Sequence, residues 1–243
     1  MTAGVVLFPG VPSGFAAGFT TLEGVAGDSP ALGRRLAAAF GVPDAEVARL
    51  AQVHGRNVLA AEGDPEPGRD RVVGEGDALV TRDPSRILAV ASADCTPVLL
   101  LDAESGWIAA VHAGWRGTAA RVVSAAIESF RERGVAAKDL LAFFGPSISR
   151  ESYEVGPEVI AALRSAHAGD PVSEDAVRPG AGDRSFVDVA AFNRAELLAA
   201  GVREDNVVDS GFCTASRKDL FPSYRRDGAG TGRVLTGVVR LPR

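Results

Sequence analysis

The chain has 243 residues, of which 46% are hydrophobic and 23% charged, a composition that can fill a large core. Its 26 basic and 31 acidic residues give a formal net charge of −5, so no overall positive field attracts nucleic acid or an anionic membrane. Disordered and fibrous classes are excluded, and we expect neither nucleic acid nor membranes among the partners. An anionic ligand would need a local basic pocket.

The length fits one large domain, and no internal repeat or interdomain linker is visible, so we expect a single domain over residues 1–243. No stretch approaches the ~20 apolar residues of a membrane span, and the N-terminus lacks a secretory signal pattern. We therefore expect a cytoplasmic protein. Its two cysteines, Cys95 and Cys213, are too few for a disulfide framework and are expected to be free thiols.

Helical and strand-like patterns alternate irregularly along the chain. Apolar residues at helical spacing predict helices at 30–40, 118–133, 157–166 and 187–200, each ending near a glycine. Apolar runs predict strands at 78–81, 87–93, 97–102, 107–113, 140–145, 206–209 and 234–240. The most loop-like stretch, 168–185, has the character of an insertion. This order predicts a mixed sheet with helices packed outside it.

The strongest local signal is a hairpin formed by the third and fourth predicted strands. If Asp102 pairs with Trp107, then Pro97 pairs with His112, and Cys95 points to the same face as His112. The two side chains are then diagonal neighbours with backbones about 7–8 Å apart, a separation that one metal ion can bridge. A slip of one residue would place them on opposite faces.

Cys95 and His112 are the ligand types that zinc prefers, and His54 in the turn-rich segment QVHGRNV is a candidate third ligand. Three ligands leave a fourth position open, as in catalytic zinc sites. The spacing matches no compact zinc-finger pattern, and an isolated His and Cys are more often packed in a core. The same residues allow another interpretation, in which Cys95 is a nucleophile and His112 its base, although no orienting partner for His112 is evident.

Two further segments carry candidate anion contacts. The turn after His112 contains Arg116 between two glycines and leads into a predicted helix, a combination that suits an anion. The segment 211–234 combines arginines, which bind phosphate, with aromatic rings, which stack on flat heterocycles. The candidate substrate-binding residues in it are Arg225, Arg226, Phe221 and Tyr224. A solvated basic loop over an aromatic core explains that segment equally well. We expect His167 on the surface.

Ordered motifs resemble the YfiH family, from about Val47 to the C-terminus. They are QVHGRNV, GDALVT, ADCTPVLLLD, VHAGWRGTAARVV, GPSISRESYEVGPEV and FCT…FPSYRRDG…TGR. Members carry the label polyphenol oxidase or laccase-domain protein and are regarded as zinc-dependent purine nucleoside enzymes. The resemblance implies an α+β fold, a single-domain α/β/β/α sandwich with mixed sheets that is grouped with deamidating toxins as a cysteine hydrolase architecture.

The resemblance also implies a catalytic zinc held by His54, Cys95 and His112. The implied reactions are phosphorolysis of adenosine, inosine, guanosine and 5′-methylthioadenosine, and deamination of adenosine. Purine nucleosides and phosphate are thus the expected partners. Zinc could activate water for attack on the purine or help to orient phosphate. Arg116 is the fourth candidate catalytic residue, and it joins Arg225 and Arg226 as a candidate anion contact.

Two positions depart from the family pattern, and three other functions remain open. Leu22 stands where the family usually has an Arg, followed here by a shortened connection, and Ser147 stands where a Cys is common. A copper-dependent polyphenol oxidase is one alternative, because these ligands also accept copper. Three histidines in the chain are too few for a multicopper cluster. The others are a cysteine hydrolase using Cys95 and a protein whose altered N-terminal segment has removed nucleoside binding.

Overall fold

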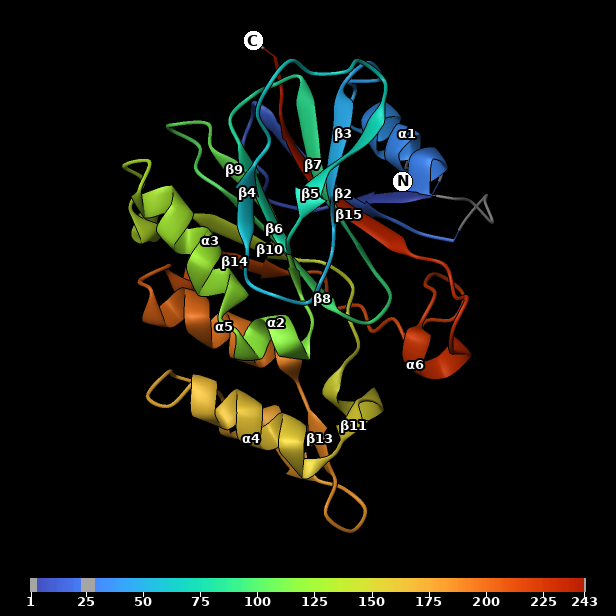
Figure 1. Ribbon diagram of the computed structural model, residues 1–243, viewed down its shortest axis with the longest axis vertical. Helices are drawn as coiled ribbons and strands as arrows, with labels where there is room; N and C mark the ends of the chain where they lie inside the picture. The colour runs from blue at the N-terminus through green and yellow to red at the C-terminus, as the bar shows by residue number, and fades with distance from the viewer. Residues whose placement is uncertain (1–3, 23–28, 243) are drawn as a thin grey trace.

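The computed structural model describes residues 4–22 and 29–242, and within these ranges the chain forms two six-stranded sheets and a small three-stranded sheet (Figure 1). The first sheet has the order β1-β2-β15-β7-β3-β5. Its strands are β1 (Val5–Leu7), β2 (Phe15–Thr20), β3 (Glu46–Ala51), β5 (Asp70–Glu75), β7 (Arg86–Ser92) and β15 (Val234–Arg240). β3 pairs in parallel with β5 and β7, and the other pairs are antiparallel.

The second sheet has the order β14-β10-β8-β9-β6-β4. Its strands are β4 (Val58–Ala60), β6 (Ala78–Thr81), β8 (Thr96–Leu101), β9 (Ile108–Ala113), β10 (Leu141–Phe144) and β14 (Val207–Asp209). Parallel pairs at both edges flank antiparallel strands in the middle, so this sheet is also mixed.

The two large sheets stack face to face, and helices cover their outer sides (Figure 1). Leu88 of β7 and Leu99 of β8 belong to the apolar cluster between the sheets. Helix α1 (Ser29–Ala39) contributes Leu36 to a cluster outside the first sheet, and α3 (Val122–Arg131) packs on the second sheet beside α5 (Val189–Ala199). The order of layers is therefore helix, sheet, sheet, helix, which confirms the expected sandwich. Because both faces of the central strands are covered, their sequences are almost continuously apolar.

The remaining elements form the region at the bottom of Figure 1. They include α4 (Pro157–Ala166) and the three-stranded sheet of β11 (Glu154–Val155), β13 (Ser185–Val187) and β12 (Val177–Pro179). A separate apolar cluster joins them to α5 and to α2 (Trp115–Ala119). The last helix is the short α6 (Tyr224–Asp227). Within the described ranges, no helix is both long and apolar enough to cross a membrane.

The predicted helix at 118–133 is two helices, because Arg121 interrupts it. Arg121 has a φ of 66°, in the left-handed region that ends a right-handed helix. Its guanidinium group binds the carbonyl oxygen of Ala166 and pairs with Asp170, at the end of α4. The chain therefore changes direction between α2 and α3, at the same residue that binds the end of α4. The predicted helix at 157–166 and the predicted strands at 78–81 and 234–240 match the observed bounds.

Candidate metal centre and adjoining cavity

His54, Cys95 and His112 come together at one end of the two large sheets. His54 follows β3, Cys95 lies in the turn between β7 and β8, and His112 is on β9. One ligand atom from each of the three lies within 4.8 Å of the other two. The Cys95 Sγ is 4.0 Å from the His54 Nε2. Within residues 4–22 and 29–242, this is the group of His, Cys, Asp and Glu side chains whose geometry suits a metal ion.

The register of the β8–β9 hairpin is the one that the sequence predicts. Pro97 pairs with His112, and the amide of Asp102 donates to the carbonyl oxygen of Trp107 at 2.9 Å. The same-face relation between Cys95 and His112 follows from this register. His54 reaches the pair from the other sheet, and its ring meets that of His112 edge to face with centroids 4.9 Å apart.

Asp77 organises two of the three candidate ligands, and the sequence analysis missed it. Its carboxylate, fully buried, accepts a hydrogen bond from Nδ1 of His112 at 2.9 Å. It also accepts from three consecutive amides in the loop that carries His54, those of Val53, His54 and Gly55, at 3.3, 2.9 and 2.6 Å. Since a carboxylate only accepts, Nδ1 of His112 carries the proton and Nε2 is left as the ligand atom. The Asp in the motif GDALVT, directly before a buried strand, was the available signal.

The cluster favours a thiolate beside a protonated imidazole when no metal is bound. Burial would raise the pKa of the Cys95 thiol, but hydrogen bonds with His112 and His54 outweigh burial and lower it to about 6. Burial would likewise lower the pKa of His112, yet Asp77 and Cys95 raise it to about 9. The hydrogen bond with His112 overcomes burial and lowers the pKa of Asp77. Cys95, His112 and Asp77 therefore carry a negative, a positive and a negative charge in that order.

Gly114 allows the ligands to approach the start of α2. A Cβ atom at this position would lie 2.7 Å from Sγ of Cys95 and 3.1 Å from Cδ2 of His54, closer than van der Waals contact permits. Gly114 has φ −71° and ψ 167°, a conformation open to any residue, so the need for glycine here is steric. The glycine in the GWRG turn thus belongs to the metal centre.

The three candidate ligands line a cavity of about 620 Å³. Aromatic and basic side chains share its wall, among them Trp115, Arg116, Tyr153, Tyr224 and Arg225. A second cavity of about 460 Å³ adjoins it and shares all of these except Tyr224. The space thus offers a metal-ligand group, flat apolar surfaces and cationic groups within one cleft, the mixture that suits a small polar heterocyclic ligand.

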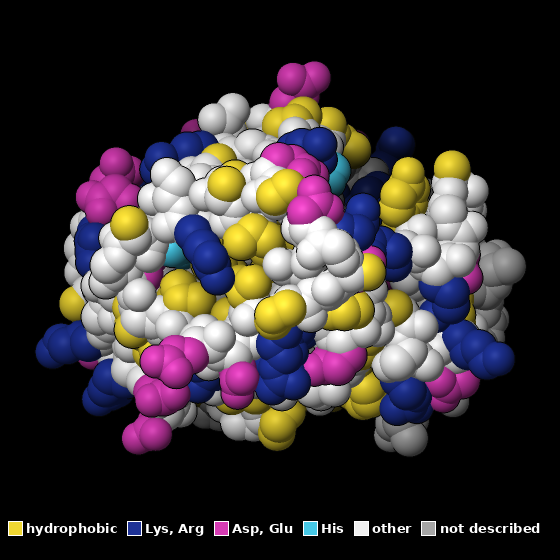
Figure 2. Space-filling view, turned by 90° about the horizontal axis from the view of Figure 1, so that it is seen from below, with side chains coloured by type: hydrophobic (Ala, Val, Ile, Leu, Met, Phe, Trp, Pro, Cys, Tyr) yellow, Lys and Arg dark blue, Asp and Glu magenta, His cyan; other side chains and the backbone are white. Residues whose placement is uncertain are grey.

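Arg116 and Arg225 are held against aromatic rings at the junction of the two cavities. The guanidinium carbon of Arg116 is 4.4 Å from the ring centroid of Trp115, and that of Arg225 is 4.6 Å from the ring centroid of Tyr153. Neither arginine forms an ion pair with a carboxylate among the described residues. Burial, with a contribution from the nearby Cys95, raises the pKa of Tyr153 to about 12, so its phenol stays protonated. Basic and acidic side chains are interspersed on the face around α4 (Figure 2), so anion selectivity must be local.

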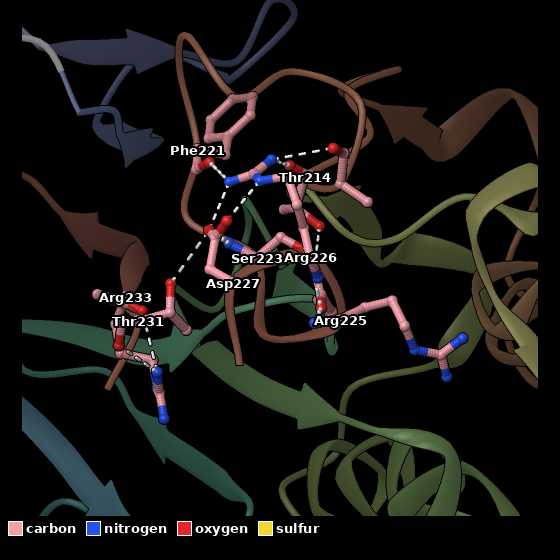
Figure 3. Close-up of polar contacts among 11 residues, drawn as sticks. Thr214, Phe221, Ser223, Arg225, Arg226, Asp227, Thr231 and Arg233 are labelled. Carbon is pink, nitrogen blue, oxygen red and sulfur yellow. Dashed lines mark hydrogen bonds and ion pairs between the residues drawn. The ribbon is translucent and has the colours of Figure 1, made fainter. Parts of the chain in front are cut away.

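Phe221 and Arg226, two of the predicted substrate-binding residues, do not line the cavities. Phe221 is fully buried in the cluster between the large sheets, where its ring packs on Phe19 and Phe212. The guanidinium group of Arg226 donates to three carbonyl oxygens of its own loop and pairs with Asp227 (Figure 3). Their roles are structural because their interacting atoms are already occupied within the fold.

The expectation that His167 lies on the surface is wrong. Its side chain is fully buried, with Nδ1 2.8 Å from the carbonyl oxygen of Leu163 and Nε2 3.0 Å from Glu196. The other carboxylate oxygen of Glu196 accepts from the amide and hydroxyl of Ser124, both at 2.7 Å. In the sequence His167 is an isolated polar residue before a loop. Its partner Glu196 lies 29 positions later, on α5, so the local pattern does not indicate the contact.

The two departures from the family pattern lie on the loops around the site. The amide of Leu22 donates to the carbonyl oxygen of Leu220 at 2.8 Å, and its side chain is 39% exposed. Residues 23–28, which complete that connection, are outside the described ranges. Ser147 pairs with Cys213 in an isolated parallel β-bridge. A cysteine therefore lies next to the position at which the family often has one.

Comparisons with known proteins show the family of this chain. A family model described as multi-copper polyphenol oxidoreductase laccase matches residues 30–241. The chain is 44% identical over 209 residues to a protein of Deinococcus radiodurans named purine nucleoside phosphorylase, covering 86% of this chain and 76% of that protein. It is 40% identical over 164 residues to a protein named adenosine deaminase RL5 from an unknown prokaryotic organism, covering 68% of this chain and 62% of that one.

The fold has a match among solved structures. The crystal structure of YlmD from Geobacillus stearothermophilus superposes with a TM-score of 0.90 at 28% sequence identity, covering 100% of this chain and 98% of that chain. Sequence and fold therefore lead to the same group of proteins as the ordered motifs. The chain belongs to the YfiH family, the laccase-domain family described as multi-copper polyphenol oxidoreductases.

Proposed function

We propose that this protein is a zinc-dependent purine nucleoside phosphorylase that also deaminates adenosine. The observation that carries the proposal is the group of His54, Cys95 and His112 in the wall of a cavity that also contains arginines and aromatic rings. The names of the relatives from Deinococcus radiodurans and of adenosine deaminase RL5 support both reactions. The substrates proposed are adenosine, inosine, guanosine and 5′-methylthioadenosine, with phosphate as the second substrate of phosphorolysis.

The residues present fit a zinc ion. One thiolate and two imidazoles form a donor set that zinc accepts, and their ligand atoms lie within 4.8 Å of one another. Asp77 fixes the ring of His112, as outer-shell carboxylates do in zinc sites. Zinc held by His54, Cys95 and His112 would supply Lewis-acid chemistry to an oxygen-containing group of a substrate.

The other residues bind and orient the substrates. In the proposed complex Arg116 and Arg225 hold phosphate, because both side chains line the two cavities and neither forms an ion pair with a carboxylate of the described residues. Trp115 and Tyr153 flank the purine with flat faces, and Tyr224, which is 56% exposed, lies at the entrance. Holding phosphate and nucleoside in one cleft lowers the entropic cost of the reaction between them.

The test is chromatography of products after incubation of metal-quantified protein with adenosine, with and without phosphate. We expect adenine only when phosphate is present and inosine in both cases. The Cys95→Ala variant should lose bound zinc and both products, and a fully active variant would overturn the proposal. Elemental analysis distinguishes zinc from copper, and oxygen consumption with a diphenol would instead indicate the oxidase activity that the family description names.

One geometric observation favours a second candidate function, a cysteine hydrolase that works without metal. Asp77 supplies the orienting partner that the sequence analysis did not find, so Cys95, His112 and Asp77 are arranged as nucleophile, base and orienting acid. The two functions differ in their response to zinc. Amide hydrolysis that increases when zinc is removed would support the hydrolase, whereas loss of nucleoside cleavage on zinc removal supports the leading proposal.

A further inference from the structure

Asp94 occupies the turn between β7 and β8, one residue before Cys95, and its backbone is strained. Its φ of 92° lies in the left-handed region, which residues with side chains rarely adopt. The residue is only 8% exposed although it lines the main cavity. A strained conformation of this kind persists only when surrounding contacts fix it, and such residues concentrate at functional sites.

The Asp94 carboxylate fixes the loop that carries Arg225. One oxygen accepts from the Thr214 hydroxyl at 2.6 Å. The other accepts from the Ser223 hydroxyl at 3.1 Å and from the backbone amide of Arg225 at 2.6 Å. Its backbone carbonyl oxygen accepts from the Ile148 amide at 2.9 Å. One side chain thus connects the turn that bears a candidate metal ligand to the start of α6.

These contacts determine where the Arg225 guanidinium group lies. Figure 3 shows its side chain extending away from the cluster in which Arg226 is engaged. One of its nitrogens donates to the carbonyl oxygen of Glu154 at 2.9 Å, and its guanidinium group stacks on Tyr153. The remaining donors are not paired with a carboxylate of the described chain, and the side chain lines both cavities.

We propose that Asp94 is a positioning residue for phosphate, acting through the Arg225 guanidinium group. This inference rests on the proposed function, in which phosphate is a substrate. Asp94 fixes the backbone of Arg225 relative to the metal-ligand turn, so phosphate bound by Arg225 is held at a fixed place relative to the nucleoside. The carboxylate itself is occupied by Thr214, Ser223 and the Arg225 amide, and it is not part of the metal-ligand group.

The kinetic test compares Asp94→Ala with Asp94→Asn in zinc-loaded protein. We expect Asp94→Ala to raise the KM for phosphate about tenfold or more, and the KM for inosine less than about twofold, because Arg225 loses its fixed position. Asparagine tolerates a positive φ and can accept the same hydrogen bonds from Ser223 and Arg225. Asp94→Asn should therefore keep a KM for phosphate close to that of the parent. Equal loss in both variants, or equal rises in both KM values, would overturn the positioning role.

A matched control lies in the same loop. Asp219 is exposed and pairs only with Arg217 among the described contacts, so Asp219→Ala removes a carboxylate without touching Asp94 or Arg225. We expect its KM for phosphate to be unchanged. Zinc content should stay at one per chain in Asp94→Ala and Asp219→Ala. Loss of zinc from Asp94→Ala would show that Asp94 acts on the metal ligands, and it would contradict a role in phosphate binding alone.

Calorimetric titration with inorganic phosphate tests the inference without turnover. We expect Asp94→Ala and Arg225→Ala each to weaken binding about tenfold, and the double variant to be no weaker than Arg225→Ala, since both act through one guanidinium group. Additive losses would overturn the inference, as would unmeasurable binding in the parent protein. If the parent binds phosphate in this coupled way but cleaves no nucleoside, the proposed function fails while the role of Asp94 stands.

Discussion

Asp77 and His112 form a buried hydrogen bond of 2.9 Å, and the same carboxylate holds the backbone of the loop that carries His54. His54 has a φ of 60°, a left-handed conformation that costs free energy unless its surroundings fix it. One side chain therefore positions two candidate ligands, one on β9 and one in the loop between β3 and β4. The orientation of these candidate ligands therefore depends on a residue outside the metal-ligand group.

Asp77→Asn should weaken zinc binding about 10- to 100-fold, the range found for outer-shell partners of zinc ligands. The amide removes the charge that orients His112 and one of the oxygens that bind the His54 loop. Competition with a chromogenic chelator measures the affinity. Asp102→Asn is the control, because Asp102 is also buried but holds the turn at the far end of the hairpin. Equal zinc affinity in the two variants would contradict the role of Asp77.

Gly114→Ala should prevent metal binding while leaving the protein folded. The added methyl group would collide with Sγ of Cys95, and the backbone at Gly114 is otherwise open to alanine. Elemental analysis and circular dichroism check the two parts of this prediction. Gly232→Ala provides the comparison, since its Cβ would have no neighbour closer than 3.8 Å and full zinc content is expected. Full zinc content in Gly114→Ala would show that the ligands can move aside.

Cys95 in metal-free protein should react with iodoacetamide with a midpoint near pH 6, well below the ordinary thiol pKa of about 8.5. The thiolate is the reactive form, so a lowered pKa means that the rate rises with pH through about 6. The measurement needs Cys213→Ser, because the hydrogen bonds from Ser149 overcome burial and lower the pKa of that thiol to about 7. A midpoint near 9 would show that His112 and His54 do not stabilise the thiolate.

His167→Ala should destabilise the fold by about 3–5 kcal/mol, because the buried Glu196 carboxylate loses the partner of one of its oxygens. Glu196, which is fully buried, would keep only its hydrogen bonds from Ser124. Urea denaturation measures the free energy of unfolding, and zinc content should not change. Arg178→Ala, which breaks an exposed pair with Asp175, should cost less than about 1 kcal/mol. Similar costs for both would contradict the structural role of His167.

The sequence predicted the part of the site that depends on local pairing. The short turn between Asp102 and Trp107 predicted the register of Pro97 opposite His112, and strong apolar runs located β6 to β9. β3 and β5 of the first sheet were harder to predict, because they mix charged and apolar residues. Their strand conformation depends on partners distant in sequence.

The missed and misplaced residues share one physical cause. Asp77, His167 and Phe221 are defined by contacts with segments far away in the chain. Composition of a segment indicates that an aromatic ring or a carboxylate is present, but not whether it turns to the core or to a cavity. Phe221 is fully buried and Tyr224, only three residues later, is exposed, and the composition of the segment does not distinguish them.

The position of β15 sets a limit on the order of folding. It lies between β2 and β7 and is made after every other described strand. Until β15 leaves the ribosome, β2 cannot be connected through it to β7 and the strands beyond. The loop that carries Arg225 is likewise not yet held in the sheet at its C-terminal end. The metal-ligand turn follows β7, the other neighbour of β15. During synthesis the nascent chain therefore cannot complete the first sheet, or hold the loop beside the candidate site from both of its ends, until this strand has been translated.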